Sequence, residues 1–147
     1  MSPTISCSSV YKIFGNNAHK LLAENNGNVD AKKFQEAGCI VGVNDASFDV
    51  NKGEMLVVMG LSGSGKSTLL RCISRLTEAT AGKILVDGED ICLMNNKQLI
   101  ELRREKMGMV FQNFALLPHK TVLENIAFPL QVKGCLLYTS PSPRDLH

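Results

Sequence analysis

The sequence predicts an α/β fold in which short strands alternate with helices, and three observations lead to this prediction. The glycine-rich run Gly60–Ser67 lies between a short apolar run, Glu54–Met59, and a segment whose apolar residues recur at helical spacing. A strand pattern extends over Ile5–Phe14 and ends at Gly15-Asn16-Asn17. Asp87-Gly88 lies between two further strand patterns and has the composition of a tight hairpin turn. The hairpin adds an antiparallel β element to the predicted fold.

The segment before the glycine-rich run contains three predicted strands and two short helical patterns. The strands are expected at Ile5–Phe14, Ala46–Val50 and Glu54–Met59, and the helices around His19–Glu24 and Asp30–Ala37. Gly38 follows the second helix at a position typical of a helix C-cap. Glu54–Met59 is apolar on both faces, so we expect it to be a buried strand of a parallel sheet.

The segment after the glycine-rich run begins with a predicted amphipathic helix. Its apolar face carries Leu69, Cys72, Ile73 and Leu76, at positions i, i+3, i+4 and i+7. Further strands are expected at Gly82–Val86, Asp90–Cys92 and Met107–Phe111, and helices from Asn95 or Asn96 to about Lys106 and from Thr121 towards Leu130. Thr121 and Glu124 have the spacing of a capping box.

The run Gly60–Ser67 fits the phosphate-binding pattern G-x-x-x-x-G-K-[ST] at each fixed position. Glycines let backbone N–H groups approach an anion closely, and Lys66 supplies a mobile positive charge. The Ser67 hydroxyl is a hard oxygen ligand suited to Mg²⁺. The residues expected to hold the phosphates are Gly60, Leu61, Ser62, Gly63, Ser64, Gly65, Lys66, Ser67 and Thr68. The alternative is a glycine-rich turn that binds nothing, and the flanking strand and helix patterns argue against it.

Composition and charge limit the classes of function that this chain can have. The 147 residues carry a formal net charge of +2 with scattered Lys and Arg, which gives no electrostatic case for a nucleic-acid surface. The length suits one domain with a sizeable core. Five cysteines without C-x-x-C spacing, and no signal-peptide pattern, indicate reduced cytosolic thiols, with Cys72 as a core residue. No apolar run approaches the ~20 residues that span a bilayer, so a membrane role depends on a partner.

A second motif, Met109–His119, narrows the choice among families of proteins with a phosphate-binding loop. A predicted strand delivers Gln112 at its end, after the phosphate-binding loop. In this order the two motifs resemble the ATP-binding subunit of ABC transporters. The resemblance implies that Lys66 and Gln112 are catalytic, that Ser67 and Gln112 hold Mg²⁺, and that ATP and Mg²⁺ are the cofactors. A Gln leaving a strand is, taken alone, usually a solvated loop residue.

The segment Val10–Gly15 resembles the loop in which an aromatic ring of this family stacks on adenine. Phe14 directly precedes the glycine and is the preferred stacking residue, with Tyr11 as the second choice. A core aromatic at the end of a strand is the alternative interpretation of Phe14.

A long insertion, Asn16–Cys39, makes the chain similar to the glycine betaine/proline betaine (quaternary amine) importer ATPase over most of residues 5–134. The resemblance implies a subunit that couples ATP binding and hydrolysis to uptake of such an amine. Its implied partners are an integral-membrane permease, a second ATPase copy placed head to tail and a solute-binding protein, and no nucleic acid. Its implied location is the cytoplasmic face of the inner or plasma membrane, where the permease holds it peripherally.

Residues 135–147 fit no element of that family. Residues 135–145 correspond to one reading frame of a common transposase sequencing adapter, so we expect the segment 135–147 to be adapter-derived. Residues 1–134 are then a partial ABC nucleotide-binding domain, cut before the signature and Walker B regions and before the general base, a Glu. We therefore expect weak nucleotide affinity and negligible turnover. A genuine Ser/Pro-rich disordered terminus is the alternative.

Three other functional interpretations stay open at this point. The chain could serve another ABC transporter, or it could be a soluble ABC ATPase that acts on nucleic acid or ribosomes. The insertion and the weak net charge argue against the soluble ATPase. The third interpretation is a non-catalytic fragment with no physiological role.

Overall fold

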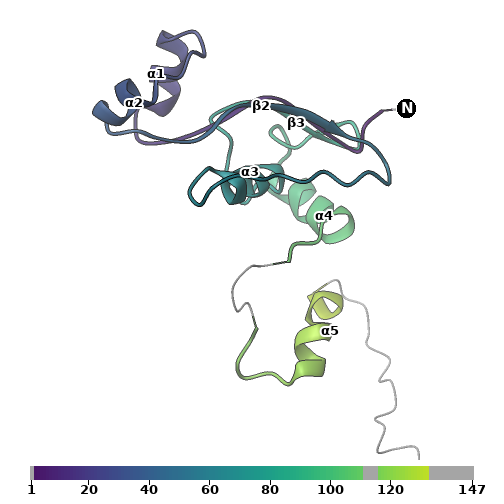
Figure 1. The fold of residues 1–147 in the computed structure, drawn as a ribbon. Helices are drawn as coiled ribbons and strands as arrows, with labels where there is room; N and C mark the ends of the chain where they lie inside the picture. The colour runs from purple at the N-terminus through teal and green to yellow at the C-terminus, as the bar shows by residue number, and fades with distance from the viewer. Residues whose placement is uncertain (1, 111–115, 133–147) are drawn as a thin grey trace, which may run out of the picture. The chain divides into compact units, whose positions relative to one another are not determined.

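A computed structural model describes residues 2–110 and 116–132 of the chain. The chain divides into two units, residues 1–101 and 102–147 (Figure 1). The predicted site residue Gln112, Phe114 of the same motif and the proposed adapter-derived segment 135–147 lie outside the described residues.

The first unit is built on a four-stranded antiparallel sheet with the order β2-β1-β3-β4. Its strands are β1 (Ile5–Phe14), β2 (Ile40–Val50), β3 (Ala81–Val86) and β4 (Glu89–Asp90). β1 pairs with β2 along its whole length, from Ile5 opposite Val50 to Phe14 opposite Ile40. The predicted strand Ile5–Phe14 is therefore confirmed, whereas β2 begins six residues before the predicted Ala46.

The hairpin between β3 and β4 is confirmed. Asp87 and Gly88 have φ values of 48° and 84°, the left-handed conformation that a tight two-residue hairpin turn requires. Glu89 pairs with Val86, and Asp90 pairs with Leu85. β4 is shorter than predicted and starts one residue earlier.

The insertion Asn16–Cys39 folds into two short helices, α1 (Ala18–Glu24) and α2 (Ala31–Glu36). Asp30 caps α2, because its Oδ1 accepts hydrogen bonds from the N–H groups of Lys32 (2.9 Å) and Lys33 (3.4 Å). Gly38 lies just past the end of α2 with φ of 72°, which agrees with its predicted role. Both helices pack on a small apolar cluster formed by Ile13, Ala18, Leu22, Phe34 and Cys39.

Helix α3 (Lys66–Ile73) packs against β1 and β2 through the predicted apolar face (Figure 1). Leu69 and Cys72 are buried, as expected. The prediction was wrong for Leu76, which is 53% exposed beyond the end of the helix. Ser74 ends α3 and donates its hydroxyl to the carbonyl of Leu70, and Arg75 then adopts a left-handed φ of 49°, which turns the chain away from the helix axis.

Burial of the Cys72 thiol supports its predicted place in the core, and Cys7 is buried as well. Burial raises the pKa of Cys7 to about 11 and also raises the pKa of Cys72. Both groups therefore stay protonated at neutral pH, as is typical of core cysteines.

Two predicted apolar strands are not formed among the described residues. Glu54–Met59 forms no strand and pairs with no described strand, and Met55, Val57 and Met59 are between 65% and 87% exposed. Residues 107–110 likewise form no strand. Apolar sequence alone does not make a strand, because each strand of a parallel sheet needs neighbours that accept and donate its backbone hydrogen bonds.

The two remaining helices start at predicted caps: Asn95, one of the two candidates for the first helix, and the Thr121–Glu124 capping box for the second. α4 (Asn96–Lys106) is preceded by Asn95, whose Oδ1 accepts from the Gln98 N–H while Gln98 Oε1 accepts from the Asn95 N–H, both at 3.0 Å. α5 (Val122–Val132) is preceded by Thr121, whose N–H donates to Glu124 Oε2 at 2.7 Å. This backbone bond and the Thr121 hydroxyl lower the pKa of Glu124. Within the described part of the chain, no helix has the length and apolar character that crossing a bilayer demands.

Thr80 joins the segment before β3 to the end of β1. Its hydroxyl accepts from the Ile13 N–H at 2.9 Å and donates to the Ile13 carbonyl at 3.1 Å, in a buried position. One buried side chain therefore pairs with both the N–H and the carbonyl of Ile13.

Thr80→Val keeps the side-chain volume and leaves the Ile13 N–H and carbonyl without this partner. We expect a loss of about 1–3 kcal/mol in the free energy of unfolding, the cost of an unsatisfied buried polar group. Urea denaturation followed by circular dichroism measures it. Thr77→Val is the matched control, and an equal loss in both variants would contradict the role given to the Thr80 hydroxyl.

Candidate nucleotide-binding site

The loop before α3 has the backbone shape that its glycines predict. Gly63 and Gly65 have φ values of 80° and 89°, in the left-handed region that residues with a Cβ rarely enter. Gly65 is also the N-cap of α3, and no side chain caps the helix there. The N-terminal N–H groups of α3 therefore stay available to an anion in the loop.

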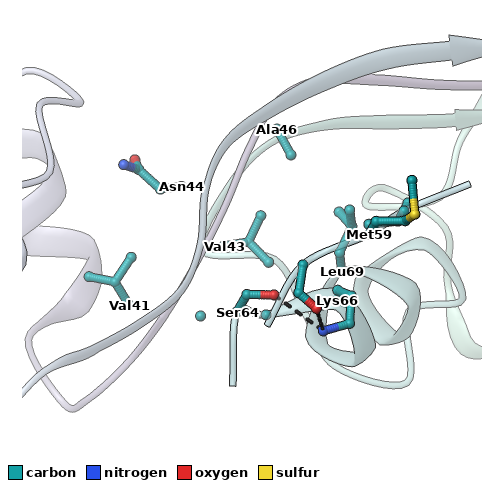
Figure 2. A pocket seen from close by; sticks show the side chains of 12 residues that line it. Val41, Val43, Asn44, Ala46, Met59, Ser64, Lys66 and Leu69 are labelled. Atoms are coloured by element: carbon teal, nitrogen blue, oxygen red, sulfur yellow. Dashed lines mark hydrogen bonds between the residues drawn. The ribbon is translucent and has the colours of Figure 1, made fainter. Parts of the chain in front are cut away.

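Lys66 closes the loop over its own backbone (Figure 2). Its Nζ donates to the carbonyl oxygens of Gly60 at 2.8 Å and Leu61 at 2.7 Å, and to Ser64 Oγ at 3.3 Å. Three donors of one ammonium group thus meet three oxygen acceptors. The positive charge lies inside the curve of the loop, where a phosphate group would be attracted to it.

Helix geometry directs the backbone donors to the same place. The Leu69 N–H donates to the Gly65 carbonyl at 2.8 Å and closes the first turn of α3. The N–H groups of Lys66, Ser67 and Thr68 precede that bond, so they point out of the helix end toward the loop. Together with the partial positive charge of the helix terminus they favour an oxyanion.

Two hollows adjoin the loop within the first unit. A hollow of about 410 Å³ lies between β2 and the loop, with Val41, Val43 and Leu69 among its apolar lining and Ser64 and Lys66 at its polar side (Figure 2). A second hollow, of about 240 Å³, is lined by Phe14, by Ile40–Gly42 of β2 and by Gly63–Thr68 of the loop and α3.

The second hollow brings the predicted aromatic residue to the predicted phosphate loop. Phe14 is 43% exposed at the end of β1, and the Lys12 Nζ lies 4.9 Å from the centroid of its ring. Tyr11 instead packs against the small apolar cluster under α1 and α2. Leu61 and Ser62, which were also predicted to contact phosphate, line neither of the two hollows.

The donor set suits a magnesium ion that is held mostly by phosphate and water. Ser67 is exposed and lines the second hollow beside the loop. In residues 2–110 and 116–132 no group of three or more His, Cys, Asp or Glu side chains is arranged to hold a metal ion. A serine hydroxyl is a hard oxygen donor of the kind that Mg²⁺ accepts as a ligand.

Sequence reasoning missed the contribution of β2 to this site. Ile40, Val41 and Gly42 line the second hollow, although the predicted strand began only at Ala46. The β-branched residues Ile40, Val41 and Val43 were a strand signal that could have extended the prediction.

A glycine-rich loop that leads into a helix packed on a β-sheet, with a lysine folded into the loop, defines a P-loop nucleotide-binding protein of the α/β class. The sequence model of the family described as "ABC transporter" matches residues 43–145. The chain therefore belongs to the ABC transporter family.

Individual relatives agree with this assignment. The chain is 79% identical over 132 residues to the trimethylamine N-oxide transport system ATP-binding protein TmoW of Pelagibacter ubique, which covers 90% of the chain and 39% of the relative. It is 43% identical over 135 residues to the glycine betaine/proline betaine transport system ATP-binding protein ProV of Escherichia coli, with 91% and 34% covered. The chain thus spans about two fifths or less of these relatives.

Solved structures show the same fold. The dimeric structure of a post-hydrolysis state of the ATP-binding cassette MJ0796, bound to ADP and Pi, matches with a TM-score of 0.68 at 29% identity. The match covers 88% of this chain and 47% of that one. The predicted resemblance to ATPases of quaternary-amine ABC importers is confirmed by these relatives, and the N-terminal part of the ABC ATPase fold is confirmed with it.

Gly65→Ala and Gly63→Ala separate backbone strain from steric contact in the loop. Both positions have positive φ, so each alanine costs roughly 1–2 kcal/mol in backbone strain. A Cβ at Gly65 would also overlap the carbonyl oxygen of Gly42, whereas a Cβ at Gly63 meets nothing within 4 Å. We expect Gly65→Ala to lower the free energy of unfolding by a further ~1–3 kcal/mol, as measured by urea denaturation. Equal losses would contradict the contact between the loop and β2.

Proposed function

We propose that this chain is the N-terminal part of the ATP-binding subunit of an ABC importer, and that residues 1–134 bind ATP through the phosphate-binding loop. The observation that carries the proposal is the Lys66 ammonium inside the loop, held by three oxygen acceptors beside the uncapped N-terminus of α3. The match to an ATP-binding cassette bound to ADP and Pi supports it.

We propose that different residues bind the phosphates and the base of ATP. Lys66 exchanges its backbone acceptors for the terminal phosphate oxygens, and the N–H groups at the start of α3 bind the same anion. Phe14 stacks on adenine at the other end of the second hollow. The Ser67 hydroxyl is the protein ligand that this part of the chain offers to Mg²⁺, which neutralises phosphate charge when bound. Gln112 is proposed as a further Mg²⁺ ligand that also orients the attacking water.

Lys66→Ala removes the charge that holds the terminal phosphates. Loss of charge-assisted hydrogen bonds of ~1.5–3 kcal/mol is expected to weaken ATP binding roughly tenfold to hundredfold. Isothermal titration calorimetry with Mg²⁺ and ATP measures the dissociation constant. Lys32→Ala, an exposed lysine on α2, is the matched control and should leave it unchanged. Unchanged affinity in Lys66→Ala would overturn the proposed role of the loop.

The same preparations test whether this part of the domain binds ATP without hydrolysing it. The resemblance assigns the general base to a Glu in a part of the domain beyond residue 134, and the curated relatives are two to three times longer than the matched segment. The 147-residue chain is therefore expected to bind ATP and to release phosphate at a negligible rate. A steady-state rate equal to that of a full-length relative would contradict this expectation.

The transported solute is proposed from the relatives, because an ATPase subunit does not contact it. The relative with 79% identity is named for trimethylamine N-oxide, and the one with 43% identity for glycine betaine and proline betaine. We propose a small methylated amine of this type as the solute, with trimethylamine N-oxide favoured by the higher identity. The partners proposed are an integral-membrane permease, a second copy of the ATPase and a solute-binding protein, at the cytoplasmic face of the membrane.

Competition between two methylated amines for uptake by the assembled transporter tests the identity of the solute. The complete subunit that contains these residues is expected to copurify with a multi-span permease and to support ATP-dependent uptake of labelled trimethylamine N-oxide into vesicles. Glycine betaine serves as the competitor, and Lys66→Ala as the inactive control. Copurification with ribosomes or DNA instead of a permease would favour the soluble ATPase.

A further inference from the structure

Gly42 of β2 touches both halves of the proposed site. A Cβ built on Gly42 would lie 2.9 Å from Cε2 of Phe14 and 3.1 Å from Cγ2 of Thr68. The Gly42 carbonyl oxygen in turn contacts the loop at Gly65, where an added Cβ would overlap it. One residue of β2 therefore lies between the aromatic ring and the phosphate-binding loop.

Space, and not backbone conformation, is what requires a glycine at position 42. Gly42 lies within β2 and has no left-handed φ, unlike Gly63 and Gly65. Any residue could adopt its backbone conformation without strain. The absent Cβ instead leaves room for the Phe14 ring and the Thr68 side chain.

The Phe14 ring is the neighbour that yields if this room is filled. Its Cε2 is at the end of a side chain that is 43% exposed, whereas Thr68 is held in the first turn of α3. Lys12 lies over one face of the ring, with its Nζ 4.9 Å from the ring centroid. A small displacement of the ring therefore changes where a base can stack relative to the phosphate-binding loop.

We propose that Gly42 is a positioning residue that fixes the Phe14 ring relative to the phosphate-binding loop, and that it thereby favours ligands carrying a purine base over bare polyphosphate. The inference rests on the proposed function, because it assigns to Gly42 the spacing between the two groups that bind ATP. It acts through Phe14 and does not itself bind the nucleotide.

The test compares ATP with inorganic tripolyphosphate, which has the phosphate chain and no base. Calorimetry on the 147-residue chain gives both dissociation constants in the presence of Mg²⁺. Gly42→Ala is expected to weaken ATP binding about threefold to tenfold, the range of one lost aromatic stacking contact. Tripolyphosphate binding should change by less than about twofold, which also shows that the variant is folded. Gly108→Ala, whose Cβ would meet nothing within 4 Å, is the matched control.

A double-mutant cycle with Phe14→Ala tests whether the effect runs through the ring. In the Phe14→Ala background, Gly42→Ala is expected to change ATP affinity by less than about twofold, because the group it displaces is gone. A full additional loss in that background would overturn the inference. Recovery of ATP affinity when Thr68→Ser is added to Gly42→Ala would also overturn it, since Thr68 and not Phe14 would then carry the effect.

The two proposals fail in different ways. A wild-type chain that binds neither ATP nor tripolyphosphate overturns the proposed function, and the role of Gly42 falls with it. A wild-type chain that binds both, together with a Gly42→Ala variant that loses both equally, overturns only the inference about Gly42.

Discussion

The site depends on the close approach of the β2 backbone at Gly42 to the phosphate-binding loop at Gly65. No side chain fits between them, because a Cβ at Gly65 would overlap the Gly42 carbonyl oxygen. Direct backbone contact fixes the loop more firmly than a flexible side chain would, since neither partner has rotamers to lose or exchange. The loop, the start of α3 and the edge strand β2 thus meet at this contact.

β1 connects that contact to the aromatic residue. It lies between β2 and β3 in the sheet; β3 pairs with it as far as Tyr11, and β2 pairs with it as far as Phe14. Thr80 adds a buried side-chain link to Ile13, next to Phe14. The ring can therefore be partly exposed and still occupy a defined position beside the loop. Partial exposure leaves the Phe14 ring accessible to a ligand, and the pairing of its backbone with β2 fixes where the side chain begins.

Local signals predicted the elements that short-range contacts stabilise. The caps at Asn95 and Thr121 and the turn at Asp87-Gly88 were recognised because each depends on residues a few positions apart. Glu54–Met59 was predicted as a strand, but it forms none with the described residues. Its apolar composition is typical of a strand buried inside a parallel sheet. Such a strand forms only where neighbouring strands are present, and composition alone does not show that they are.

The sequence by itself determined the class of the protein, because the phosphate-binding pattern requires each residue type at a fixed spacing along the chain. It also indicated Lys66 and Phe14, whose roles follow from charge and from an aromatic face. Only the tertiary structure decided that Phe14, and not Tyr11, lines the hollow at the loop. It also decided that Gly42 lies between the Phe14 ring and the phosphate-binding loop. Those facts depend on the register of β1 against β2, which joins residues far apart in the chain and has no local signature.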